Sequence, residues 1–127
     1  SVTGVQTCAL PISTLGDPLA DFTYFLMNWI MPADGQFGIF GCDFEESGIP
    51  TLEETLVRYC AATGRAGIEN LDWYFAYNLF RLTAIGQGVK KRMLEGNASS
   101  ASASDIVRRI VPFAQLAWKH ALLAGAN

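Results

Sequence analysis

The sequence predicts an all-α fold, on three observations. Apolar residues recur at helical spacing in several stretches of the chain. Residues that favour helix ends stand at the borders of these stretches. No stretch alternates apolar and polar residues as a strand with one buried face would. With 127 residues, of which 50% are hydrophobic, the chain is long and apolar enough to build the core of one domain.

The first helix is expected to begin at Asp17 and to end near Met31. Asp17 is a suitable N-cap, and proline is favoured at the first helical position, where Pro18 stands. The apolar residues that follow have helical spacing and comprise Leu19, Phe22, Phe25, Leu26, Trp29 and Ile30. Pro32 should stop the helix, because the residue before a proline disfavours helical geometry. The glycine-rich stretch 33–50 is interpreted as an irregular connection.

Two further helices are indicated by their ends. Thr51 and Glu54 have the spacing of a capping box, and the helix that they begin should stop at Gly64. Asn70 is expected to cap the longest helix, roughly 71–95. Its middle is apolar nearly all round, which predicts a central and buried helix.

The C-terminal part is predicted to contain a small-residue linker, 98–104, and a last helix, 104–123. Pro112 should kink this helix or mark where it restarts. The whole chain is thus expected to hold about four helices.

Composition excludes several classes of function. The formal net charge is -3, with acidic and basic residues interspersed, which argues against a nucleic-acid partner. Three cysteines without CxxC spacing and a single histidine make a zinc site improbable, and such sparse cysteine usage fits a cytoplasmic location. The longest apolar stretch, 22–31, is too short to span a membrane, which needs about 20 residues.

The first twelve residues are interpreted as foreign to the domain. They contain no charge and no helical or strand periodicity, and they lack the basic start of a signal peptide. Residues 2–12 resemble the conceptual translation of a sequencing adapter, and on that reading Cys8 is an artefact. The native sequence would then begin near Ser13. A native leader without regular structure is the alternative.

One motif is conspicuous, the run Ser-Thr-Leu-Gly-Asp-Pro-Leu-Ala-Asp-Phe over residues 13–22. By residue chemistry alone it is a turn that leads into a capped helix. It also resembles the stretch just after the metal-binding loop of the aminoglycoside phosphotransferase and choline kinase-like family. The resemblance is greatest to the branch fused to acyl-CoA dehydrogenases.

Further matches extend the resemblance from Ser13 to the C-terminus. They lie in 48–51, 58–59, 63–65, 73–75, 80–82, 84–85, 87–88 and 96–99. The resemblance implies that residues 13–127 are the C-terminal helical subdomain of a protein-kinase-like fold, and that the domain is incomplete.

The same resemblance implies an ATP- and magnesium-dependent transfer of a phosphoryl group to an alcohol of a small molecule, such as a hydroxy acid or a hydroxyacyl compound. Such catalysis depends on positioned metal ions and a carboxylate base. The family's His-Gly-Asp and Asp-Trp-Glu motifs are absent from this sequence. We therefore assign no catalytic residue and no metal ligand, and we expect the 127-residue chain alone to be inactive.

In this family the C-terminal helices wall the acceptor site. We therefore expect these helices to supply aromatic side chains that wall the site and one cation that binds a carboxylate or phosphate. The candidates are the aromatic residues Trp29, Trp73, Tyr74 and Tyr77 and the cation Arg81. The alternative is that the aromatic residues belong to the core and that Arg81 forms a salt bridge.

Two aspartates are assigned structural roles. Asp17 should cap the first helix, and Asp21 resembles a family carboxylate that bonds to the catalytic loop. Without that loop, Asp21 should be solvated or should find a local partner.

A different class of function remains open, a free-standing helical binding module without catalysis. Such a module should have polar outer faces. The phosphotransferase interpretation instead predicts an exposed apolar surface where other parts of a larger domain would pack.

Overall fold

The computed structural model describes residues 16–97 and 101–127. Across these ranges it contains helices, connections and one isolated bridge between Pro32 and Phe40, and no strand. The all-α prediction is therefore confirmed, although the described ranges hold six α-helices instead of the four or so expected. The adapter-like residues 1–12, with Cys8, lie outside the described residues. So do residues 13–15 of the Gly-Asp-Pro motif and residues 98–100 of the predicted linker.

The first described helix, α2 (Pro18–Leu26), begins as predicted. The Asp17 side chain accepts a hydrogen bond from the backbone N–H of Leu19 at 2.9 Å and so caps the helix. Beyond Leu26 the chain tightens into the 3-10 turn η1 (Met27–Trp29). The α-helix therefore ends earlier than Met31, and the tighter turn occupies most of the difference.

The connection between η1 and the next long helix is less irregular than predicted. Phe40 N–H donates to Met31 C=O at 2.9 Å, and Ala33 N–H donates to Phe40 C=O at 3.2 Å, which closes a loop. Gly38 makes this closure feasible. Its φ is +84°, and a Cβ there would lie 2.1 Å from the Met31 carbonyl oxygen. A short helix, α3 (Phe44–Ser47), follows, capped by Asp43.

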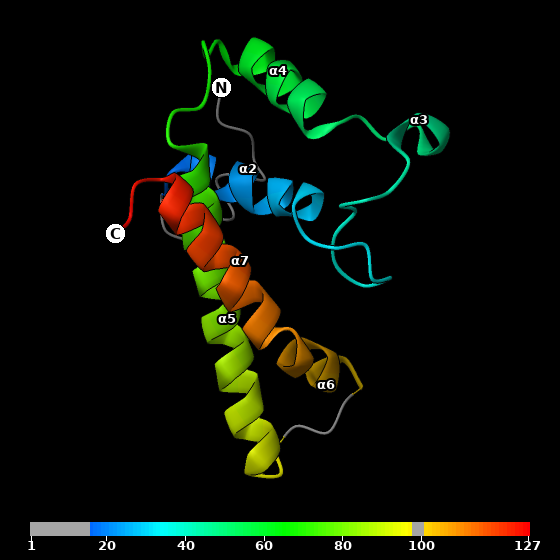
Figure 1. The fold of residues 1–127 in the computed structure, drawn as a ribbon, viewed down its shortest axis with the longest axis vertical. Coiled ribbons are helices and arrows are strands. Elements are labelled where there is room, and N and C mark those ends of the chain that lie inside the picture. The colour runs from blue at the N-terminus through cyan, green and yellow to red at the C-terminus, as the bar shows by residue number, and fades with distance from the viewer. Residues whose placement is uncertain (1–15, 98–100) are drawn as a thin grey trace, which may run out of the picture.

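Helix α4 (Leu52–Thr63) has the predicted ends. Both hydrogen bonds of the Thr51–Glu54 capping box are present, and Gly64 closes the helix with φ 70°. The helix stands apart from the others (Figure 1) and contains no buried residue. The Tyr59 ring, stacked on Phe22 with centroids 3.6 Å apart, connects it to α2.

Helices α5 (Leu71–Leu94) and α7 (Ile110–Leu123) lie side by side and form the centre of the structure (Figure 1), while α2 crosses the first half of α5. Asn70 stands at the predicted N-cap of α5 with φ 58°, but its side chain makes no capping hydrogen bond. The core residues come from all these elements and comprise Leu26, Met27, Trp29, Met31, Phe75, Leu79, Phe113 and Ala117.

Helix α5 is central, as predicted, but the prediction that it is buried is wrong for part of its circumference. Its large apolar side chains are strongly exposed at Trp73 (52%), Phe80 (68%) and Leu94 (80%). Within the described ranges only α2, η1, α6 and α7 pack closely on α5, so part of its circumference faces solvent. Large apolar side chains of α5 are thus exposed in the described part of the chain.

The C-terminal helix is divided in two, as Pro112 suggested. Helix α6 (Ala101–Arg108) and α7 meet at Arg109, and Pro112 falls in the first turn of α7, where its missing N–H costs no helical hydrogen bond. The linker predicted over 98–104 is wrong from Ala101 onward, because these residues already belong to α6.

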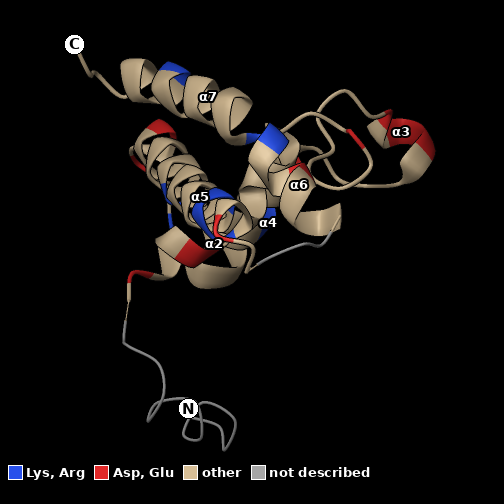
Figure 2. Cartoon of the chain, turned by 90° about the horizontal axis from the view of Figure 1, so that it is seen from below, with Lys and Arg blue, Asp and Glu red and all other residues tan. Residues whose placement is uncertain are grey.

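Charged residues are spread over the elements. Figure 2 shows acidic residues on α3 and basic residues on α5 and α6. No helix of the described part is both long enough and apolar enough to cross a membrane.

Candidate functional site

An exposed aromatic row runs along the N-terminal half of α5. Trp73 and Tyr77 are one helical turn apart, and their rings are stacked with centroids 5.4 Å apart and planes 6° apart. Both side chains are exposed, Trp73 at 52% and Tyr77 at 41%. Two large flat rings on one helix face therefore offer a surface on which an apolar part of a ligand can pack.

Arg81 continues this row by one more turn. Its guanidinium carbon lies 5.6 Å from the centroid of the Tyr77 ring and 6.0 Å from that of Tyr24 on α2. Two rings thus orient the cation by cation–π contact. Within residues 16–97 and 101–127 no carboxylate pairs with Arg81, whose side chain is exposed. The guanidinium is therefore available to an anionic ligand.

A buried polar contact fixes the helix beneath this row. Asn78 is fully buried, and its amide donates to the Ala20 carbonyl at 3.1 Å and to Thr23 Oγ1 at 3.0 Å. Its oxygen accepts from an Arg81 N–H at 3.4 Å. The contact sets the position of α5 against α2 and so the position of Arg81 between its two tyrosines.

Next to the row lies an apolar groove of about 470 Å³, which we call the α5 groove. Trp73, Tyr77 and Phe80 form one side, and the last turn of α7 with the residues after it forms the other. That second side consists of the small residues Ala121, Ala124, Gly125 and Ala126. The groove is therefore wide because one of its walls has almost no side chains.

Tyr74 faces a different part of the surface from Trp73 and Tyr77. Its hydroxyl donates to the Asp17 carboxylate, which also accepts from Leu19 N–H. These two bonds, with a smaller contribution from the charge of Arg65, hold the pKa of Asp17 below its usual value. The same hydrogen bond to Asp17 raises the pKa of Tyr74. Tyr74 lines a second cavity of about 690 Å³ with Arg65 and Asn70.

The structure separates the five predicted substrate-binding residues. Trp73, Tyr77 and Arg81 form one surface, with Tyr74 at its edge through a ring contact to Trp73 at 5.3 Å. Trp29 does not belong to that surface. It is buried in the core at 7% exposure, and its indole N–H donates to the Pro50 carbonyl at 2.9 Å. The position of Trp29 fits the alternative interpretation, in which the aromatic residues belong to the core.

The two predicted structural aspartates differ in their surroundings. Asp17 caps α2 and bonds Tyr74, as described above. Asp21 is exposed on α2, which agrees with its expected solvation.

Metal and cofactor ligands cannot be named from this part of the chain. Among residues 16–97 and 101–127 no three His, Cys, Asp or Glu side chains gather closely enough to hold a metal ion.

Sequence reasoning missed three residues of the site. Asn78 could have been noticed as an amide within an apolar stretch of helix. Tyr24 and Phe80 carried no such indication, because aromatic residues at helical spacing are ordinarily part of the core. Their exposure follows from which helix faces remain uncovered in three dimensions.

Comparison with known proteins identifies relatives of this region, although no family model matches the chain. Mouse acyl-CoA dehydrogenase family member 10 is 40% identical over 116 residues, which is 90% of this chain and 11% of that protein. Human acyl-CoA dehydrogenase family member 11 is 33% identical over 105 residues, 82% of this chain and 14% of that protein. The Arabidopsis thaliana protein IBR3, named as a probable acyl-CoA dehydrogenase, is 35% identical over 94 residues, 70% of this chain and 11% of that protein.

A solved structure shares the fold. The crystal structure of a Ralstonia eutropha JMP134 protein assigned as an aminoglycoside phosphotransferase superposes with a TM-score of 0.79 and 41% sequence identity. The match covers 87% of this chain and 34% of that one. The chain thus spans only a small part of its sequence relatives and about a third of this structural neighbour. Fold and sequence together place the chain in the aminoglycoside phosphotransferase-like family, as a C-terminal helical part of a kinase-like fold.

Proposed function

We propose that this chain supplies the acceptor-binding helices of an ATP-dependent phosphotransferase that acts on an alcohol group of a small molecule. The observation that carries the proposal is the arrangement of Arg81 beside the Trp73–Tyr77 stack, whose two rings line the α5 groove. An apolar or flat part of the acceptor would pack on the two rings, and an anionic group would bind the guanidinium.

The preferred acceptor is a hydroxy acid or a hydroxyacyl compound. A carboxylate or another anionic group on the acceptor would meet Arg81, which has no acidic partner in the described part of the chain. A polycationic acceptor such as an aminoglycoside is disfavoured, because the Arg81 cation lies 5.6 Å from the centroid of the Tyr77 ring.

ATP and magnesium would be supplied and held by other parts of the phosphotransferase. This chain would bind and orient the acceptor and exclude water from it, which for phosphoryl transfer is a large share of catalysis. We expect no turnover by the 127-residue chain alone, because its sequence lacks the His-Gly-Asp and Asp-Trp-Glu motifs.

The proposal includes a cytoplasmic location and no nucleic-acid or membrane partner. Cys42 and Cys60 are free thiols, as is usual in a reducing compartment. The net charge of -3 disfavours binding to a polyanion.

Two measurements test the proposal. The first is the sequence of the gene upstream of the Ser13 codon in an independent clone. We expect Asp-Trp-Glu directly before Ser13 and His-Gly-Asp further upstream. A different upstream sequence would contradict the kinase assignment and favour the binding module without catalysis.

The second measurement uses the longer protein that carries those motifs, with ATP, magnesium and a panel of hydroxy acids. Arg81→Gln should raise KM for the acceptor about tenfold and leave kcat unchanged, because Arg81 binds the acceptor in the ground state and the transition state alike. Arg92→Gln, on the same helix outside the groove, is the matched control. An equal loss of kcat and kcat/KM in Arg81→Gln would refute the binding role.

A further inference from the structure

A second apolar groove lies between the loop after η1 and the outer side of α7, and we call it the Phe40 groove. It has a volume of about 470 Å³, which is the size of a small-molecule site. Its walls include Ile30, Pro32, Phe40, Pro112, Phe113 and Lys119. It shares no lining residue with the α5 groove, so it is independent of the proposed acceptor site.

The loop wall of this groove is held in place before any ligand arrives. Phe40 is 62% exposed, yet its backbone is fixed by hydrogen bonds to Met31 and Ala33. With the backbone fixed, only the side-chain rotamer of Phe40 has to be ordered when a ligand binds. The groove therefore needs little ordering when it binds, which favours affinity.

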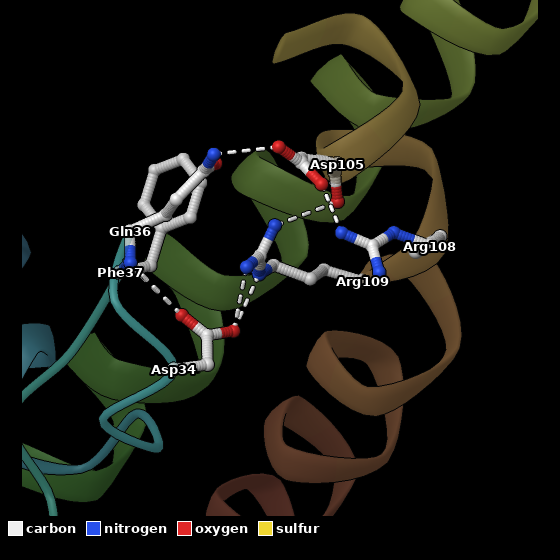
Figure 3. A network of polar contacts seen from close by, with 6 residues as sticks. All are labelled: Asp34, Gln36, Phe37, Asp105, Arg108 and Arg109. Atoms are coloured by element: carbon white, nitrogen blue, oxygen red, sulfur yellow. Dashed lines mark hydrogen bonds and ion pairs between the residues drawn. The ribbon is translucent and has the colours of Figure 1, made fainter. Parts of the chain in front are cut away.

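A polar network holds the same loop to the helices from the other end (Figure 3). Arg109 Nε and Nη2 both lie 2.7 Å from Asp34 Oδ2, and Nη1 donates to the Asp105 carbonyl at 2.9 Å. The Arg109 guanidinium also lies 5.1 Å from the centroid of the Phe37 ring. Backbone N–H of Phe37 and the Arg109 side chain together hold the pKa of Asp34 below its usual value. The loop is thus clasped to the α6–α7 junction.

The lining of the Phe40 groove holds the Lys119 cation and no anion. Its lining contains Lys119 and His120 but no Asp or Glu, although the chain as a whole has a net charge of -3. His120 is buried, and its Nδ1 lies 2.7 Å from Asp72 Oδ1 outside the groove lining. Lys119 is exposed and has no ion-pair partner within residues 16–97 and 101–127. Lys119 is therefore the cation of this groove that can pair with a ligand.

We propose that the Phe40 groove binds a small aromatic monocarboxylate. The aromatic body packs against the Phe40 and Phe113 rings and the flat faces of Pro32 and Pro112, and the carboxylate pairs with the Lys119 ammonium. Phe, Pro and an exposed cation in one groove match a ligand with one apolar ring system and one negative charge.

Calorimetric titration of the 127-residue chain with 2-naphthoate tests this, with the neutral 2-naphthalenemethanol as a reference ligand of the same shape. The chain should bind the carboxylate about threefold to tenfold more tightly than the alcohol. Lys119→Gln should remove that preference without weakening the alcohol, and Lys119→Arg should keep it. Lys90→Gln, an exposed cation of α5 outside the groove, should behave as the unmodified chain.

Two variants test the walls. Phe40→Ala should weaken both ligands equally, since it removes apolar contact and no charge. Asp34→Asn should weaken both ligands by about threefold, because it loosens the clasp that holds the loop while leaving Lys119 in place.

Three results would overturn the proposal. The first is equal affinity for the carboxylate and the alcohol. The second is retention of the preference in Lys119→Gln. The third is concentration-dependent self-association in sedimentation velocity that Phe40→Ala abolishes, which would assign the groove to a second copy of the chain.

Discussion

Asn78→Ala tests whether a buried polar contact fixes α5 against α2. The substitution removes the two hydrogen bonds that the buried Asn78 amide donates, to the Ala20 carbonyl and to Thr23 Oγ1, and the longer one, 3.4 Å, that its oxygen accepts from the exposed Arg81. The two donated bonds are worth about 1 kcal/mol net each, the longer bond to the solvated guanidinium adds little, and the small cavity left behind adds about 1 kcal/mol. Alanine returns roughly 0.6 kcal/mol through its higher helix propensity. The free energy of unfolding should therefore fall by about 2 kcal/mol, and Tm by about 8 °C.

Urea unfolding followed by circular dichroism at 222 nm measures this change, with an unchanged dependence on urea as evidence that the folded state stays compact. Gln87→Ala is the matched control, because it removes an exposed amide from the same helix, and its effect should stay within about 0.5 kcal/mol. A loss below that value in Asn78→Ala would refute the reasoning.

A double-mutant cycle isolates the contact itself. Thr23→Val removes the hydroxyl that accepts from Asn78 and keeps its shape, and the pair should show a coupling of about 1 kcal/mol. Additive effects of the two substitutions would mean that the Asn78–Thr23 hydrogen bond contributes nothing and that the bond to the Ala20 carbonyl and packing carry the loss.

Three further predictions concern other parts of the chain. Gly38→Ala should destabilise the loop by about 3 kcal/mol, because φ is +84° and a Cβ would overlap the Met31 carbonyl. Gly35→Ala, where φ is +88° and the space is open, should destabilise it by about 1 kcal/mol. Hydrogen exchange of the loop amides measures both effects. Tyr74→Phe should lower Tm most between pH 3.8 and 10.0, the ordinary pKa values of Asp17 and Tyr74. Folding lowers the pKa of Asp17, so the stabilisation from Asp17 is lost as pH falls through its folded pKa. Folding raises the pKa of Tyr74, so the stabilisation from Tyr74 is lost as pH rises through its folded pKa. A difference in Tm that does not change with pH would contradict the Tyr74–Asp17 hydrogen bond. Thr51→Ala should destabilise α4 by about 1 kcal/mol and speed hydrogen exchange there, with little change in global Tm because α4 buries no residue.

Local chemistry explains why several elements could be predicted from the sequence. The Asp17 cap and the Thr51–Glu54 capping box depend on groups two or three residues apart, and Gly64 needs only its own freedom at positive φ. Such features are complete within one turn of chain. The Gly-Asp-Pro motif and its companions were likewise readable as a family resemblance before any fold was known.

The site was less predictable, because exposure depends on neighbours that are distant in sequence. Trp29 and Trp73 are both tryptophans on helical stretches, yet Trp29 is 7% exposed and Trp73 is 52% exposed. Trp29 packs in the core cluster and donates its indole N–H to the Pro50 carbonyl, whereas Trp73 lies on a face of α5 that the described part of the chain leaves half exposed. No pattern within either helix distinguishes the two.

The sequence by itself determined the start of α2, both ends of α4, that strands play no part in the residues described, and which family the chain resembles. Tertiary structure alone decided that Arg81 lies between Tyr24 and Tyr77, and that Arg109 clasps Asp34 across 75 positions of the chain. The physical reason is the distance along the chain over which each interaction acts. Caps and turns are stabilised by atoms within a few residues, whereas grooves, ring pairs and long-range ion pairs form only when packing of the apolar faces brings separate elements together.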